Sequence, residues 1–229
     1  MSKKFLTISI PAYNDSKSLV KLVNESQEFC RHLGLDFEML IINDGSQDDT
    51  LVVAHELARK YNNITVRHHE KNAGFGVTLK EAFTLPKSEW VLFLPGDNQF
   101  PVSNLEVFLK LKDNYDYILG YRKYRRDTAG RKIYSFIYNR LISLVTKIPV
   151  RDVNSIVFYR SKILDSVSLK STSAFVHAEF FIKTVRQGFR VCETEVVHQE
   201  REFGLGAGGS LCVIAATIKE LFLYIAGKI

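Results

Sequence analysis

The stretch that decides the fold is residues 37–61, FEMLIINDGSQDDTLVVAHELARKY. It begins with the largely apolar run FEMLIIN, which predicts a buried strand, and ends with TLVVAHELARKY, which predicts a helix. The polar segment NDGSQDD between them contains an Asp-Gly turn signal. A strand that passes directly into a helix is the repeating unit of sheets built from parallel strands.

The same alternation continues on both sides of this stretch. Further strands are predicted at FLTISIP, ITVRHH and WVLFLP, and further helices at SLVKLVNESQEFCRHLG and GVTLKEAFTL. Strands that alternate with helices imply a mostly parallel central sheet with helices on both faces. We therefore predict an α/β fold for the first half of the chain, about residues 1–120.

The second half of the chain is less regular. Strands are predicted at YDYILGYR, IVFYR and FRVCETEVVHQ, and helices at GRKIYSFIYNRLISLVTK and AEFFIKTVRQG. No linker separates the two halves. We predict a single domain over residues 1–229, with a smaller α+β half at about 121–210 and a C-terminal helix at 211–229.

The C-terminal stretch LCVIAATIKELFLYIAGKI is the most apolar part of the chain. Lys219 and Glu220 interrupt it, which makes it a poor membrane span and favours an amphipathic helix. Such a helix either packs on the core or lies on a membrane surface.

Composition excludes little. The net charge of +6 is compatible with nucleic acid, a nucleotide, a phosphate group or a membrane surface as partner. The aromatic and basic motifs of the common RNA-binding modules are absent, so nucleic acid is the least favoured. The apolar run at the N-terminus is too short for a signal peptide, and Cys30, Cys192 and Cys212 lack metal-ligand spacing. We expect reduced thiols in a cytoplasmic protein.

Four loops lie where ligands bind in parallel sheets, outside the carboxyl ends of the strands: PAYND, NDGSQDD, HHEKNAGFG and PGDNQFP. Each has an ordinary structural interpretation as well. Asp44 could close an Asp-Gly turn or accept hydrogen bonds from a nucleotide base. The glycines of NAGFG could simply begin a helix, or they could let a phosphate approach its N-terminus.

The loop PGDNQFP offers one carboxylate, Asp97, with the amides of Asn98 and Gln99. Mg²⁺ and Mn²⁺ prefer oxygen ligands, and Mg²⁺ commonly uses one or two carboxylates plus substrate phosphates. The alternative is an exposed turn before the next helix. The basic run GYRKYRRDTAGRK is likewise either a solvated face or a binding site for phosphate oxygens.

Taken in order, the motifs resemble those of family 2 glycosyltransferases with the GT-A fold, a Rossmann-like architecture. The resemblance is to the branch with dolichol-phosphate mannose synthases and bacterial polyprenyl-phosphate sugar transferases. It extends from Ile8 to the C-terminal helix and rests on IPAYND, INDGSQDDT, NAGFGVTLKEAF, GDNQFP, GYRKYRRD, VRDVNS and AEFFIKTVRQGFRVCETEVVHQER.

The resemblance implies a donor site for a UDP- or GDP-sugar. The residues that would line the nucleoside are Pro11, Tyr13, Asp15 and Asp44, and those that would shape the wall beside it are Asn72, Gly74 and Gly76. Asp97 matches the second Asp of the family's Asp-x-Asp metal motif, and Gln99 is the expected second ligand for Mg²⁺ or Mn²⁺. Pro95 stands in place of the first Asp, and Asn43 in place of a common Asp.

The resemblance also implies an acceptor site and a mechanism. Arg122, Arg131 and Ser135 fall where relatives hold an acceptor phosphate. Acidic positions near the sugar and acceptor are matched by Asp152 and Glu179, and the family's His-x-x-Arg by His198 and Arg201. The expected reaction is an inverting single displacement, in which a divalent cation and Arg201 stabilise the departing diphosphate.

The acceptor class decides whether a base is needed. A polyprenyl or dolichyl phosphate is already an anion and needs none, whereas a saccharide hydroxyl would make Asp152 or Glu179 the candidate base. The leading hypothesis is transfer to the lipid phosphate, in cell envelope polysaccharide biosynthesis, at the cytoplasmic face of a membrane. A membrane partner protein and a homo-oligomer fit this hypothesis. The alternative is a catalytically weakened relative that binds nucleotides or acts as a scaffold.

Overall fold

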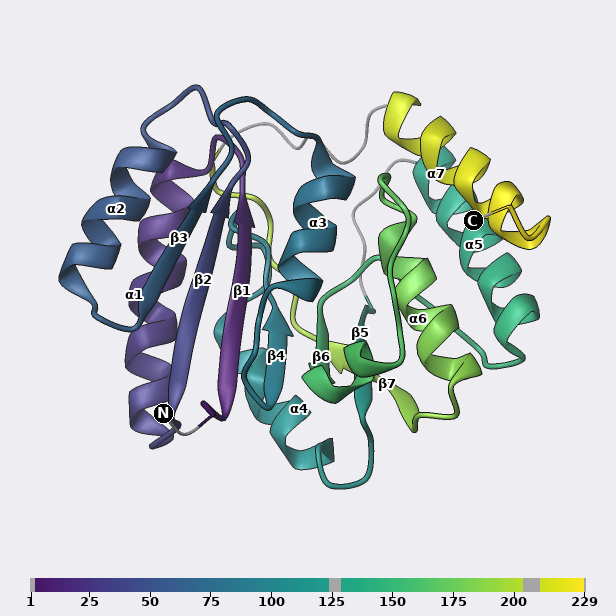
Figure 1. Cartoon of the computed structure of the whole chain (residues 1–229), viewed down its shortest axis with the longest axis horizontal. Coiled ribbons are helices and arrows are strands. Elements are labelled where there is room, and N and C mark those ends of the chain that lie inside the picture. Colours follow the sequence, from purple (N-terminus) through teal and green to yellow (C-terminus); the bar gives the residue numbers. More distant parts are fainter. Residues whose placement is uncertain (1–2, 124–128, 204–210, 229) are drawn as a thin grey trace.

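The computed structural model describes residues 3–123, 129–203 and 211–228, and Figure 1 shows how they are arranged. The described strands form one sheet in the order β3-β2-β1-β4-β6-β5-β7. Their bounds are β1 Leu6–Ala12, β2 Phe37–Asn43, β3 Ile64–His68, β4 Trp90–Phe93, β5 Tyr117–Arg122, β6 Val157–Arg160 and β7 Val191–Val196.

Most neighbouring strands are parallel. The pairs β1–β2, β1–β4, β2–β3 and β5–β7 are parallel, whereas β6 runs antiparallel to both β4 and β5. The predicted mostly parallel α/β sheet is therefore confirmed. Because β6 lies between β4 and β5, one sheet runs through both halves of the chain.

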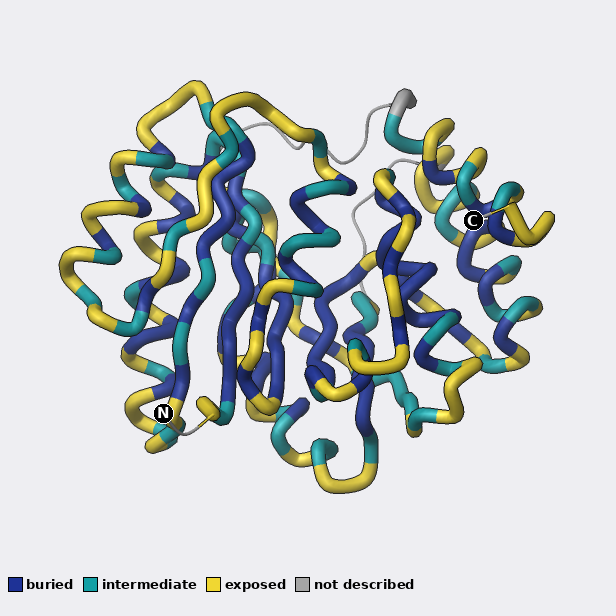
Figure 2. Tube along the Cα trace, in the orientation of Figure 1, coloured by how far each residue is buried: buried dark blue, intermediate teal, exposed yellow. Residues whose placement is uncertain are grey.

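Helices cover both faces of the sheet. Their bounds are α1 Ser16–His32, α2 Thr50–Lys60, α3 Phe75–Thr84, α4 Leu105–Leu111, α5 Ala129–Thr146, α6 Val176–Arg186 and α7 Leu211–Ile225, with 3₁₀ turns η1 at Val102–Asn104 and η2 at Ser161–Asp165. One apolar core lies under α1, α2 and α4, and the other under α3, α5, α6 and α7. Figure 2 shows the strands mostly dark blue and the outer sides of the helices largely yellow.

The apolar residues of α1 form one buried face, as their spacing predicts. Leu19, Leu22 and Val23 are completely buried against the sheet. Gly34 follows the helix with φ +63°, the left-handed conformation that commonly ends a helix and that glycine adopts without strain. The sequence therefore stops α1 and turns the chain back into β2.

Two glycines let neighbouring segments approach each other closely. A Cβ on Gly45 would lie 2.4 Å from the backbone nitrogen of Asn72, and one on Gly76 would lie 2.1 Å from the carbonyl oxygen of Thr172. Neither distance is possible for a real side chain. Glycine at these positions lets the loop after β2 and the first turn of α3 pack against backbone.

The C-terminal helix α7 is amphipathic, as predicted. Leu221 and Tyr224 are buried in the core, while Phe222 and Ile225 are 62% and 53% exposed. Glu220 accepts hydrogen bonds from the hydroxyl groups of Ser171 and Ser173 and so anchors the helix. None of the helices in the described part of the chain combines the length and the apolarity that crossing a bilayer requires.

Candidate active site

A cavity of about 310 Å³ lies at the carboxyl ends of β1, β2 and β4. Its lining includes Asp44, which follows β2, and Asp97, which lies in the loop after β4. Residues at the start of α5 also line it. The sequence-predicted residues that line it are Pro11, Tyr13, Asp15, Asp44, Asp97, Gln99, Arg122, Arg131, Ser135, Asp152 and Arg201. The rule that ligands bind at the carboxyl ends of parallel strands therefore locates this cavity.

Asp44 is held rigidly at one end of the cavity. It is 3% exposed, and its backbone N–H donates to the carbonyl oxygen of Ala12. Its Oδ1 accepts from the backbone N–H of Ala73 at 2.8 Å and lies 2.8 Å from Nδ1 of His69. A buried, oriented carboxylate of this kind can accept hydrogen bonds from the N–H groups of a nucleotide base.

Two carboxylates and one guanidinium meet next to Asp44. Nη2 of Arg201 donates to Oδ2 of Asp97 at 2.7 Å, and Nη1 donates to Oδ1 of Asp15 at 3.4 Å. Burial raises the pKa of Asp15 to about 6, against the opposing effects of the Tyr13 N–H and of Arg201. The guanidinium of Arg201 can bind diphosphate oxygens, and the two carboxylates can bind a divalent cation beside it.

The residues present fit a hard divalent cation that takes part of its ligands from the substrate. Asp97 supplies a carboxylate, and Asp15 is its neighbour across Arg201. Within the described ranges, no group of three or more His, Cys, Asp or Glu side chains could hold a metal ion by itself. Magnesium commonly binds in this way, through one or two carboxylates plus phosphates and water.

Gln99 supports the segment that carries Arg201. Its backbone carbonyl accepts from the N–H of Gln199 at 2.7 Å, and its side-chain amide donates to the carbonyl oxygen of Gln199 at 3.4 Å. Its backbone N–H in turn donates to Oδ1 of Asp97 at 3.1 Å. The predicted metal ligand Gln99 therefore has a structural contact that the sequence did not indicate.

Two arginines and a carboxylate line the part of the cavity next to α5. Arg122 forms a bidentate ion pair with Asp152, with Nε–Oδ2 and Nη2–Oδ1 distances of 2.6 and 2.9 Å. Arg131 and Ser135, from the first two turns of α5, also line this part. An arginine fork and a hydroxyl group together are suited to bind phosphate oxygens.

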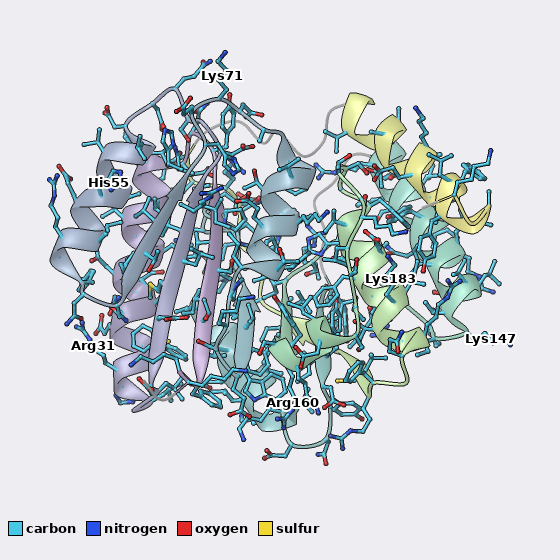
Figure 3. The ribbon with its side chains drawn as sticks, in the orientation of Figure 1. Arg31, His55, Lys71, Lys147, Arg160 and Lys183 are labelled. Atoms are coloured by element: carbon cyan, nitrogen blue, oxygen red, sulfur yellow. The ribbon has the colours of Figure 1, made fainter. Side chains whose placement is uncertain are left out.

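The structure does not bring Glu179 to the cavity. Its carboxylate is fully buried and accepts hydrogen bonds from the backbone N–H groups of Lys170 and Ser171 and from the Nζ of Lys183. Lys183 lies on α6 and is labelled in Figure 3. With this many donors, Glu179 holds the 170–171 segment against α6, so its location does not support the expected role near the sugar.

Other predicted residues also lie outside the cavity lining. Asn72 packs against the turn at Gly45, and Gly76 packs against residues 172–173. Gly74 caps the start of α3 with φ +95°. The ring of His198 packs against Phe100, with centroids 4.9 Å apart.

His177 is a cavity residue that the sequence analysis missed. It lies on α6, is 3% exposed and packs against the rings of Phe83 and Phe93. Its Nδ1 is buried without a hydrogen-bond partner in the described structure, and burial lowers its pKa to about 3. A neutral histidine with an unused nitrogen borders the cavity beside Asp152. Its position among the apolar residues of AFVHAEFF was the one feature of the sequence that could have indicated a buried histidine.

Comparisons with known proteins agree with this architecture. The family described as Glycosyl transferase family 2 matches residues 7–166. Undecaprenyl-phosphate 4-deoxy-4-formamido-L-arabinose transferases of Pseudomonas savastanoi pv. phaseolicola and Klebsiella pneumoniae subsp. pneumoniae are each 29% identical to this chain, over 206 and 207 residues. Both matches cover 88% of this chain but 60% and 62% of the relatives. The chain thus spans about three fifths of the length of these relatives.

Solved structures share the fold. Glucosyl-3-phosphoglycerate synthase from Mycobacterium tuberculosis, in complex with Mn²⁺, UDP and glucosyl-3-phosphoglycerate, matches with a TM-score of 0.74. The match covers 98% of this chain and 80% of that chain, at 14% sequence identity. At this identity the likeness is one of fold, and it confirms the predicted GT-A architecture.

Proposed function

Because this chain belongs to glycosyl transferase family 2, we propose that it transfers a sugar from a nucleoside-diphosphate sugar to a polyprenyl phosphate. The observation that carries this proposal is that one cavity is lined by groups suited to both substrates. Asp44 and Asp97, with Arg201 beside Asp97, suit a nucleotide base, a cation and a diphosphate, and Arg122, Arg131 and Ser135 suit a phosphate group. A donor and an anionic acceptor would therefore bind next to each other in this cavity.

The donor would bind at the carboxyl ends of β1, β2 and β4. Asp44 would accept from the base, and the diphosphate would lie against Arg201. Solved relatives of this fold bind UDP with Mn²⁺ or Mg²⁺, which supports a UDP-sugar and a divalent cation here. Asp97, with Asp15 beside it, would hold that cation. When bound, the cation would neutralise charge on the diphosphate.

The chemistry asked of this chain's own residues is positioning and charge stabilisation. An oxygen of the acceptor phosphate would attack the anomeric carbon as the bond from that carbon to the diphosphate breaks, with inversion of configuration. Arg201 would stabilise the negative charge that grows on the leaving group. Because the attacking oxygen is already anionic, no base has to remove a proton. Arg122, Arg131 and Ser135 would orient it.

The names of the curated relatives support a lipid acceptor, since both are undecaprenyl-phosphate transferases. The surface agrees. On α5, Phe136 and Leu144 are 72% and 65% exposed, and on α7, Phe222 is 62% exposed. Both helices contribute to the same core, and residues of both line the cavity. We propose that these apolar side chains rest on a membrane surface, with Lys147 at the end of α5 near the lipid headgroups (Figure 3).

A transfer assay tests the proposal. UDP- and GDP-sugars with labelled sugar are incubated with undecaprenyl phosphate in detergent or vesicles, with Mn²⁺ or with chelator. We expect a labelled lipid product from one donor class, reduced by chelator and abolished in Asp97→Ala. Nucleotide binding without transfer to any acceptor would instead indicate a catalytically weakened relative. Transfer to a saccharide but not to the lipid would overturn the acceptor class.

A further inference from the structure

One histidine joins the cavity carboxylate Asp44 to a second carboxylate outside the cavity. His69 follows β3, and its backbone N–H donates to the carbonyl oxygen of Asn43, which fixes its main chain beside the end of β2. Its Nδ1 lies 2.8 Å from Oδ1 of Asp44, and its Nε2 lies 3.1 Å from Oε2 of Glu81 on α3. The imidazole therefore spans two acceptors that belong to different elements.

The geometry requires two protons on the ring. A carboxylate is an acceptor, so both ring nitrogens must donate for both contacts to be favourable, and this holds in the imidazolium form. A neutral ring has one N–H and would turn a lone pair toward one of the two carboxylates. The charged groups that face His69 are Asp44 after β2 and Glu81 on α3, and Arg67 on β3 lies 3.6 Å from Glu81.

We propose that His69 is a positioning residue that holds Asp44 in the orientation for the nucleotide base, and that the protonation of His69 regulates donor binding. This inference rests on the proposed function, because it assigns Asp44 to the base of the donor. Within the described residues, both side-chain contacts of Asp44 fall on Oδ1 and none on Oδ2. His69 and the N–H of Ala73 would thus hold one oxygen while the other is left for the ligand.

The electrostatics agree with this role. Burial lowers the pKa of His69, but the hydrogen bonds and charges of Asp44 and Glu81 outweigh burial, so the pKa is raised above 6.5. A raised pKa means that the protonated form is favoured in the fold. The support that protonated His69 gives to Asp44 is then fully present at low pH and weakens as the pH rises through the pKa of His69.

The test measures UDP and GDP binding by calorimetry, with Mn²⁺, from pH 5.5 to 8.5. In the wild-type protein we expect the affinity for the preferred nucleotide to fall as the pH rises. In His69→Ala we expect an affinity about tenfold weaker at low pH, the effect of one charge-assisted hydrogen bond, and a flat profile. His69→Asn, which places an amide N–H near the position of Nδ1, should bind more tightly than His69→Ala while remaining flat.

Glu81→Gln tests the role of the His69 charge more specifically. It leaves the cavity lining unchanged and removes one of the two anions, so the midpoint of the pH profile should move to lower pH. His55→Gln, an exposed histidine on α2 (Figure 3), is the matched control and should keep the wild-type profile. In a transfer assay, His69→Ala should raise the KM for the donor with little change in kcat.

The outcomes are distinguishable. A wild-type protein that binds nucleotide with a pH profile unchanged in His69→Ala and Glu81→Gln would overturn this inference alone. A wild-type protein that binds neither nucleotide at any pH would overturn the proposed function and this inference with it.

Discussion

Arg122 and Asp152, 30 residues apart in the chain, form a bidentate ion pair at the wall of the cavity, and Asp152 is 2% exposed. Arg122, which is expected to bind the acceptor phosphate, is thus ion-paired with Asp152, which was the candidate base. An acceptor phosphate near Arg122 would add a second anion to the same guanidinium. A base role for Asp152 is disfavoured by the same pair, because both of its carboxylate oxygens already accept hydrogen bonds from Arg122.

Removing one member of this pair should destabilise the fold. We expect Arg122→Ala to lower the free energy of unfolding by about 3–5 kcal/mol, because it removes the guanidinium from a buried carboxylate. Urea denaturation followed by circular dichroism measures this. The double variant Arg122→Met with Asp152→Asn should recover most of the loss. If Arg122→Ala is as stable as the wild-type protein, groups other than Arg122 must stabilise the buried charge of Asp152.

The bridge that Arg201 forms between Asp97 and Asp15 leads to a prediction about rate. Arg201→Ala should slow sugar transfer by about 10²–10³-fold, the usual effect of removing one group that stabilises developing charge. Arg201→Lys should recover a part, since it keeps the charge but cannot reach both carboxylates with a fork. Arg31→Ala, an exposed arginine on α1 (Figure 3), is the control and should retain full activity. Equal rates in all three variants would exclude Arg201 from the reaction.

The apolar side chains on α5 and α7 predict membrane association. Phe136→Asp and Phe222→Asp should each weaken co-sedimentation with anionic vesicles by about tenfold or more, because each removes a buried aromatic ring from the bilayer interface. Val52→Asp is the matched control, since Val52 is 57% exposed on α2. Binding that all three substitutions leave unchanged would show that this face does not contact the membrane.

His177 predicts a specific sensitivity to acid. Its pKa is lowered to about 3 by burial, so the folded state binds fewer protons than the unfolded state below pH 6.5. The stability from the neutral ring is fully present above pH 6.5 and is lost as the pH falls toward 3, at about 1.4 kcal/mol per pH unit. Urea unfolding at pH 7 and pH 5 should therefore show a smaller loss for His177→Phe than for wild type. An equal loss in both would place the acid-sensitive group elsewhere.

Asp44 and Asp97 could be found from the sequence because Asp44 directly follows a buried strand and Asp97 lies in the loop after another. Parallel neighbours end at the same edge of the sheet, so a local pattern is enough to place both side chains there. The amphipathic nature of α7 was equally accessible, since apolar spacing and the interrupting Lys219 and Glu220 are local features. The sequence could not show that Glu220 anchors α7 on Ser171 and Ser173.

The roles of acidic residues were harder to predict. Asp152 and Glu179 look alike as residues near a strand or helix boundary, yet one borders the cavity and the other is enclosed by donors from Lys170, Ser171 and Lys183. Which way each carboxylate faces depends on the antiparallel insertion of β6 and on how α6 packs over it. Neither follows from periodicity, and His177 was missed for the same reason.

By itself, the sequence determined the alternation of strands and helices, the turns that end them and the edge of the sheet where the cavity lies. These follow from the spacing of apolar residues and from turn chemistry, which act over a few residues. The tertiary structure alone decided which carboxylate pairs with which cation: Arg201 with Asp97 and Asp15, Arg122 with Asp152, and His69 with Asp44 and Glu81. The physical reason is that a charged pair forms between side chains whose separation is set by the packing of whole elements.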